Sequence, residues 1–210
     1  MNYLRIVIVK IVLLLPVFTC GQTNPSIVGG SYIDIKEVPY QISMKVDGVH
    51  HCGGTILSDR WILTAAHCLK YYTPIINATR ITIHAGTTNQ TDTTQGQIIQ
   101  AQTVFIHPLF NDSISLEHDI ALIYLTQPLT FNNSVRPIEY ATACNTDSTD
   151  FHIGNRAYLS GWGYPCRHCN IASPNLKGAS LPLIHRDTAL AINIAVHSGF
   201  TTPITYATIL

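Results

Sequence analysis

Short apolar segments separated by turns fill residues 40–125, and this pattern constrains the fold more than any other feature of the sequence. The segments are QISMKV, GGTIL, WILTAA, RITIHAG, IIQAQTVFIH and DIALIYL. The first is followed by Asp47-Gly48, a pair typical of tight turns between strands. No long window keeps the 3.6-residue period of an amphipathic helix. The chain is therefore predicted to be all-β, with its strands arranged as a barrel or a sandwich.

Two of these segments place polar side chains at strand ends. The β-branched run that begins at Trp61 delivers His67 immediately before Cys68. In DIALIYL, the residues after Asp119 are apolar on both faces of the expected strand. This pattern predicts a strand that is buried on both sides, with the carboxylate of Asp119 at its start. Taken singly, His67 beside a cysteine is more often structural, and Asp119 could be an ordinary strand-capping carboxylate.

Five motifs taken in order change that interpretation. IVGG at residues 27–30, HCGGTIL at 51–57, TAAHC at 64–68, HDIAL at 118–122 and GWG at 161–163 follow the order found in chymotrypsin-like, trypsin-type serine proteases. The chain resembles this family from Ile27 to about Ile184. The resemblance implies a peptidase domain over 27–184, with a first antiparallel β-barrel over about 27–128 and an incomplete second barrel over about 129–184. Residues 185–210 form a divergent tail.

The resemblance also assigns roles to single residues. It implies that His67 is the general base and Asp119 the carboxylate that orients it. A disulfide between Cys52 and Cys68 would fix where His67 points and, closing a loop of about 15 residues, would add about 3 kcal/mol of stability. Ile27 would be the new N-terminus made by zymogen cleavage. Ser26 departs from the family here, because a trypsin-like activating protease would require Arg or Lys before the cut.

The nucleophile of the family is absent from these 210 residues, because the motif Gly-Asp-Ser-Gly-Gly does not occur. Beyond Gly163 the serines are Ser173, Ser180 and Ser198. Only Ser198 precedes a glycine, and Phe200 stands where a second glycine would shape the oxyanion loop. In a protease with the same kind of triad, loss of the serine alone costs about a million-fold in turnover. The 210 residues are therefore predicted to be inactive as a protease.

Two explanations of this pattern stay open. The first is a serine endopeptidase precursor whose sequence is truncated before the catalytic-serine motif, with the last 23 or so residues arising from a shifted frame, a retained intron or an alternative exon. The second is a non-catalytic protease homologue that acts as a binding or regulatory protein. Protein and peptide substrates or protease inhibitors are the partners that the resemblance implies.

The N-terminal residues indicate secretion. Arg5, the apolar run 6–18 and the small residues that follow predict a signal peptide over 1–21, with 22–26 as a short linker. A membrane anchor is the alternative, but the run contains Lys10 and is shorter than the ~20 residues that span a bilayer. Four glycosylation sequons agree with secretion. They begin at Asn77, Asn89, Asn111 and Asn132.

The cysteines of a secreted chain are expected to form disulfides. Removal of Cys20 with the signal would leave an odd number, and the pairing of Cys144, Cys166 and Cys169 stays open. The pair Cys166 and Cys169 has the spacing of half a zinc site, but no matching second pair of ligands occurs, so no metal is expected.

The charge pattern excludes two classes of partner. The chain has 12 basic and 12 acidic residues and no basic cluster. The composition therefore predicts no basic surface that would bind nucleic acid or an anionic membrane. No cofactor is expected.

Overall fold

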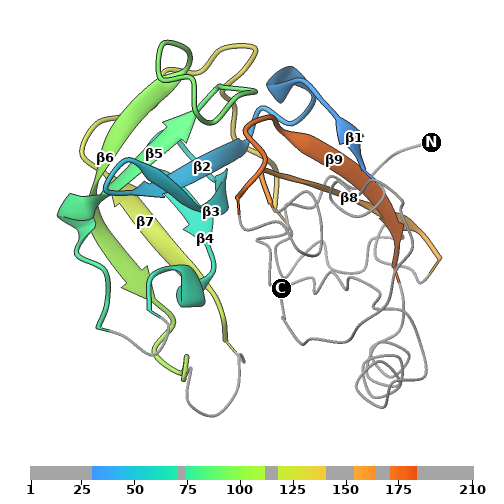
Figure 1. Cartoon of the computed structure of the whole chain (residues 1–210). Coiled ribbons are helices and arrows are strands. Elements are labelled where there is room, and N and C mark those ends of the chain that lie inside the picture. Colours follow the sequence, from blue (N-terminus) through green and yellow to red (C-terminus); the bar gives the residue numbers. More distant parts are fainter. Residues whose placement is uncertain (1–29, 71–73, 112–117, 141–153, 164–170, 184–210) are drawn as a thin grey trace.

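Six antiparallel strands close into a barrel in the computed structural model, which describes residues 30–70, 74–111, 118–140, 154–163 and 171–183 (Figure 1). The order around the barrel is β2-β3-β4-β7-β6-β5. The strands are β2 (Gln41–Val46), β3 (Val49–Ile56), β4 (Trp61–Thr64), β5 (Ile81–Ala85), β6 (Gln97–Ile106) and β7 (Ala121–Leu125). The described residues also form three short 3-10 helices: η1 (Ile35–Glu37), η2 (Ala66–Cys68) and η3 (Ala78–Arg80).

The barrel closes because alternate residues of each strand are apolar and point inward. In β2, Ile42 and Met44 are fully buried in the barrel core. The turn between β2 and β3 has positive φ at both Asp47 (51°) and Gly48 (82°), the backbone that a two-residue hairpin requires. Other core residues come from every strand of the barrel, among them Ile56, Ile62, Ile81, Ile83, Ala101, Ile123 and Leu125.

A second, three-stranded antiparallel sheet lies beside the barrel in the order β1-β9-β8 (Figure 1). Its strands are β1 (Ser31–Tyr32), β8 (Arg156–Gly161) and β9 (Lys177–Pro182). Strand β1 falls within the residues that the sequence assigned to the first barrel, yet it pairs with β9. The reason is packing: the segment after β1 buries apolar side chains against Trp162 and Leu176. Those side chains are Ile33, Ile35, Val38 and Tyr40.

Hydrogen bonds across the seam hold the sheet to the barrel. The carbonyl oxygen of Thr88 accepts from the backbone N–H of Leu176 at 2.8 Å and from the indole Nε1 of Trp162 at 2.9 Å. The hydroxyl of Thr88 accepts from the backbone N–H of Ile35 at 3.0 Å. Buried Ser160 of β8 donates to the side chain of Gln41 at 2.7 Å. The loop after β5 therefore serves as the bridge between the two sheets.

The predicted fold class is confirmed: the chain is all-β, with one closed antiparallel barrel and a second, partial sheet. The signal segment 1–21, the linker 22–26 and the tail 185–210 lie outside the described residues, and the domain limits stay predictions. Among the described residues, no helix is both long and apolar enough to cross a membrane.

Candidate active site

Strand pairing brings His67 and Asp119 to one end of the barrel. Strands β4 and β7 are neighbours, and their register places Thr64 opposite Ala121. His67 follows the end of β4 within η2, and Asp119 precedes the start of β7. The pairing of β4 with β7 therefore brings together two residues that are 52 positions apart in the chain.

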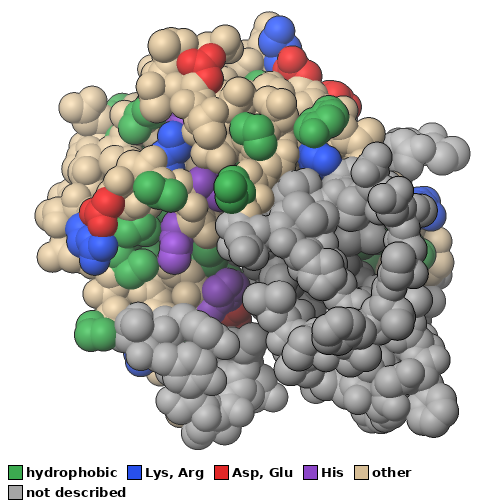
Figure 2. All heavy atoms as spheres, in the orientation of Figure 1, with side chains coloured by type: hydrophobic (Ala, Val, Ile, Leu, Met, Phe, Trp, Pro, Cys, Tyr) green, Lys and Arg blue, Asp and Glu red, His purple; other side chains and the backbone are tan. Residues whose placement is uncertain are grey.

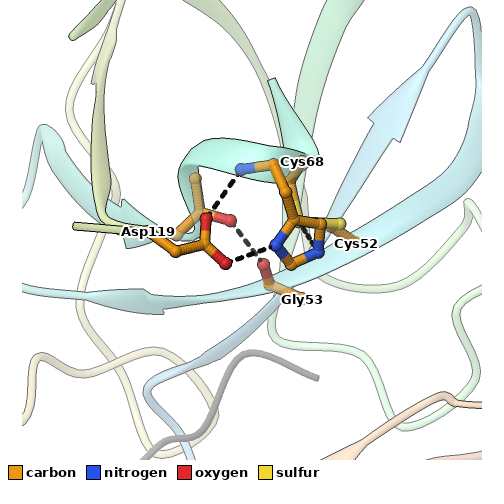
Figure 3. The surroundings of a disulfide bond; sticks show 6 residues. Cys52, Gly53, Cys68 and Asp119 are labelled. Carbon is orange, nitrogen blue, oxygen red and sulfur yellow. Dashed lines mark hydrogen bonds and ion pairs between the residues drawn. A yellow bond between two sulfur atoms is a disulfide. The ribbon is translucent and has the colours of Figure 1, made fainter. Parts of the chain in front are cut away.

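The carboxylate of Asp119 holds His67 by two hydrogen bonds (Figure 3). Oδ1 accepts from the backbone N–H of His67 at 2.8 Å, and Oδ2 pairs with the ring Nδ1 at 2.6 Å. Only 1% of the Asp119 side chain is exposed, against 20% for His67. Because a carboxylate only accepts, the imidazole proton lies on Nδ1, and Nε2 is the ring nitrogen that carries the lone pair. This arrangement equips Nε2 to accept a proton from a neighbouring group.

His118 shapes the backbone that presents Asp119. Its φ of 57° is left-handed, a conformation in which histidine is more common than most other residues, and its carbonyl accepts from the N–H of Ile120 at 2.7 Å. The ring of His118 stacks on that of His107, with centroids 4.8 Å apart and planes within 9°. The sequence pattern did not predict this pair; the HDIAL motif contained His118 but gave no sign of its backbone or its partner.

The disulfide between Cys52 and Cys68, the residue directly after His67, has Cα atoms 6.1 Å apart (Figure 3). It joins β3 to η2. His67 Nε2 lies 3.5 Å from the sulfur of Cys68. The imidazole and the two sulfurs are close enough to suggest a metal site, but sulfurs bonded to each other are not thiolate ligands. The disulfide therefore has a structural role: it restrains the backbone next to His67.

The two histidines before Cys52 lie in β3 where a β-bulge interrupts the pairing with β2, because Met44 pairs with Cys52 and Lys45 with His50. His50 is half-buried, shares a 2.7 Å hydrogen bond with Ser43 and meets Trp162 edge-on. His51 is exposed in part and lies near His67 and the backbone of Cys68. Burial lowers the pKa of His51, a hydrogen bond to the carbonyl of Cys68 opposes this shift, and nearby His67 adds to the lowering. At a pH above 6.5, the ordinary pKa of histidine, His51 is therefore uncharged and adds no positive charge beside His67.

Charged side chains are dispersed over the described surface that Figure 2 shows. Figure 2 shows Lys, Arg, Asp and Glu side chains scattered over one face, with histidines at several points on the barrel. The ion pair of Arg80 with Asp47 is exposed on both sides.

The serines described beyond Gly163 are engaged elsewhere. The hydroxyl of Ser173 donates to the carbonyl of Asn175 at 2.8 Å, and that of Ser180 accepts from Arg156 at 2.8 Å. Ser198 and Ile27 lie outside the described residues, and so do three cysteines: Cys144, Cys166 and Cys169. The sequons at Asn77, Asn89, Asn111 and Asn132 begin in described loops and turns.

Comparisons with known proteins agree on one family. The family model described as Trypsin matches residues 27–201, which runs beyond the limit at about Ile184 expected from the motifs. The chain is 30% identical over 178 residues to trypsin of Simulium vittatum, covering 82% of this chain and 67% of that protein. It is 33% identical over 162 residues to transmembrane protease serine 9 of Rattus norvegicus, covering 76% of this chain but only 14% of the longer rat protein.

The matched region contains both members of the His67–Asp119 pair and both cysteines of the disulfide. The closed barrel with a second sheet beside it is the architecture expected of a chymotrypsin-like fold. The chain belongs to the trypsin family of serine proteases.

Proposed function

We propose that this chain is a secreted serine endopeptidase family member in which His67 is the general base and Asp119 the residue that orients it. The observation that carries the proposal is the 2.6 Å contact of His67 Nδ1 with a carboxylate that is 1% exposed. In a serine protease, this contact holds a proton on Nδ1, so that Nε2 can take the proton of the attacking hydroxyl, and it stabilises the imidazolium that forms. The substrates would be proteins or peptides.

The 210 residues alone are proposed not to cleave peptide bonds. They contain no Gly-Asp-Ser-Gly-Gly motif, so they supply neither the hydroxyl that His67 would activate nor the backbone amides that would stabilise an oxyanion. Ser173 and Ser180 hydrogen-bond within their own sheet region. Neither is a candidate for the missing role.

A non-catalytic protease homologue is the second candidate function. It is supported by a barrel whose six strands all have two neighbours, because such a unit presents no open edge to other chains. In this case the chain would bind a protease, an inhibitor or another protein without hydrolysing it.

Covalent labelling of the secreted protein with a fluorophosphonate, a reagent for activated serines, tests the proposal. We expect no labelling of the 210-residue chain and no cleavage of peptide substrates. The matched control is Ser198→Ala, which should behave identically. Labelling that disappears in Ser198→Ala and in His67→Ala would identify Ser198 as a nucleophile and overturn the proposed inactivity.

A further inference from the structure

Three glycosylation sequons in the described part of the chain adopt one local geometry. In each, the side-chain oxygen of the asparagine accepts from the backbone N–H two residues later, at 2.9 Å for Asn77, 3.0 Å for Asn89 and 2.8 Å for Asn132. The local geometry is therefore shared, and differences in their surroundings must decide which sites a folded protein can carry a sugar on.

Asn77 has open surroundings. Its side chain is exposed, as are Thr79 and Ile75 on either side of it. It precedes η3, and both interactions of its side-chain oxygen are with Thr79, within the sequon itself. A sugar on the amide nitrogen would therefore extend into solvent without displacing a contact between distant segments.

Asn132 is also exposed, and it lies beside a depression of about 420 Å³. The depression is lined by Gly86, Gly96, Gln97, Asn132, Asn133, Ser134 and Val135. The backbone of Asn132 pairs with Val135 in a tight turn, with hydrogen bonds of 2.9 and 3.3 Å, so the turn does not depend on the amide nitrogen of the side chain. The open volume next to it gives the first sugar room.

Asn89 differs because it lies in the seam between the barrel and the second sheet. Its backbone forms a bridge with Asn175, and the next residue, Gln90, is 8% exposed and donates to the carbonyl of Pro174 at 2.9 Å. The preceding residue, Thr88, carries the hydrogen bonds that dock Trp162 and Leu176. A bulky, strongly hydrated group here would compete with the contacts that hold the two sheets together.

We propose that the secreted protein carries N-linked glycans at Asn77 and Asn132 and is unmodified at Asn89. The inference rests on the proposed secretion. In the reaction, the Asn amide nitrogen attacks the anomeric carbon of a lipid-pyrophosphate-linked oligosaccharide; the new C–N bond replaces the C–O bond to pyrophosphate, and the amide proton leaves with the lipid pyrophosphate. Because the sequon at Asn111 continues outside the described residues, the proposal does not include it.

The test is site mapping on the full chain, made in a eukaryotic secretory cell and collected from the medium. An amidase that releases N-glycans converts each occupied asparagine to aspartate, and peptide mass mapping then gives the occupancy of every sequon. We expect conversion at Asn77 and Asn132 and none at Asn89. Thr79→Ala should abolish conversion at Asn77 while Thr79→Ser retains it, and Ser134→Ala and Ser134→Thr form the same pair for Asn132.

Chains retained inside the cell are mapped in parallel, so a protein that fails to reach the medium still gives a result. Secreted or retained protein that has entered the secretory compartment but lacks sugar at Asn77 or Asn132 would overturn the glycan proposal alone. Secreted protein with sugar at Asn89 would overturn the seam argument. A chain that stays in the cytosol with no sugar at any sequon would overturn secretion and the glycan proposal together, while the labelling experiment on His67 would be unaffected.

Discussion

Replacing Asp119 by Asn should reverse the position of the proton on His67. The amide oxygen of the new side chain can still accept from the backbone N–H of His67, where Oδ1 now lies at 2.8 Å. The amide NH₂ then faces the ring Nδ1, which is 2.6 Å from Oδ2 in the native chain. Two donors cannot face each other, so Nδ1 must lose its proton and Nε2 must gain it.

The cost follows from the two hydrogen bonds that change. Bonds to a charged group contribute about 1.5–3 kcal/mol each and neutral ones about 0.5–1.5 kcal/mol. Replacing both would cost about 2–3 kcal/mol, and the smaller desolvation cost of a neutral amide offsets part of that, which leaves about 1–2 kcal/mol. Asp119→Ala leaves two donors of His67 without an acceptor, and should cost about 3 kcal/mol or more.

Two measurements check this reasoning on the chain as it is, without any need for catalysis. Imidazole ¹⁵N chemical shifts report which ring nitrogen carries the proton, and urea unfolding gives the loss of stability. We expect Nδ1–H in the native chain, Nε2–H in Asp119→Asn, and a larger loss of stability in Asp119→Ala than in Asp119→Asn. A proton that stays on Nδ1 in Asp119→Asn, or an Ala variant as stable as the native chain, would refute the pairing argued here.

Three further predictions concern stability. Replacing both Cys52 and Cys68 by Ala should lower the free energy of unfolding by about 3 kcal/mol, measured by urea unfolding, because their disulfide closes a loop of 16 positions; an unchanged value would contradict a loop constraint. Burial lowers the pKa of His84 from its ordinary 6.5, so the unfolded chain takes up a proton first as the pH falls. Stability should therefore be full above pH 6.5 and decline below it, and urea midpoints at successive pH values should show a weaker decline in His84→Gln. Gly96 has a φ of 76°, and an added Cβ would lie 2.2 Å from the carbonyl oxygen of Ala85, so Gly96→Ala should cost well over the roughly 1 kcal/mol expected of Gly48→Ala, where φ is also positive but nothing lies within 4 Å; equal losses in thermal unfolding would refute the steric argument.

The sequence predicted the barrel best where alternation was local. The segment QISMKV coincides with β2, because its apolar residues alternate and Asp47-Gly48 ends it. Strand β3 begins earlier than GGTIL suggested: the hairpin pairs Val46 with Val49, but the polar His50 and His51 obscured the strand there. Local pattern therefore located the strands but not all of their ends.

The second sheet was harder to predict because its pairing is non-local. Strand β1 is only two residues long, and its partner β9 begins at Lys177, far along the chain. No periodicity in either segment indicates that they meet. The same holds for the site, because the strand patterns did not predict that Asp119 is the partner of His67. That pairing requires β4 and β7 to be neighbours in the barrel, and only the resemblance to a family implied the pairing.

Thr88 has a consequence for how this protein tolerates change over evolution. Two of the three hydrogen bonds that it receives across the seam end on its carbonyl oxygen, which every amino acid possesses. Only the bond from the backbone N–H of Ile35 requires an acceptor on the side chain. Substitutions at this position can therefore leave two of the three hydrogen bonds between the barrel and the second sheet intact. A variable residue at position 88 among related sequences would then hide the structural importance of its backbone.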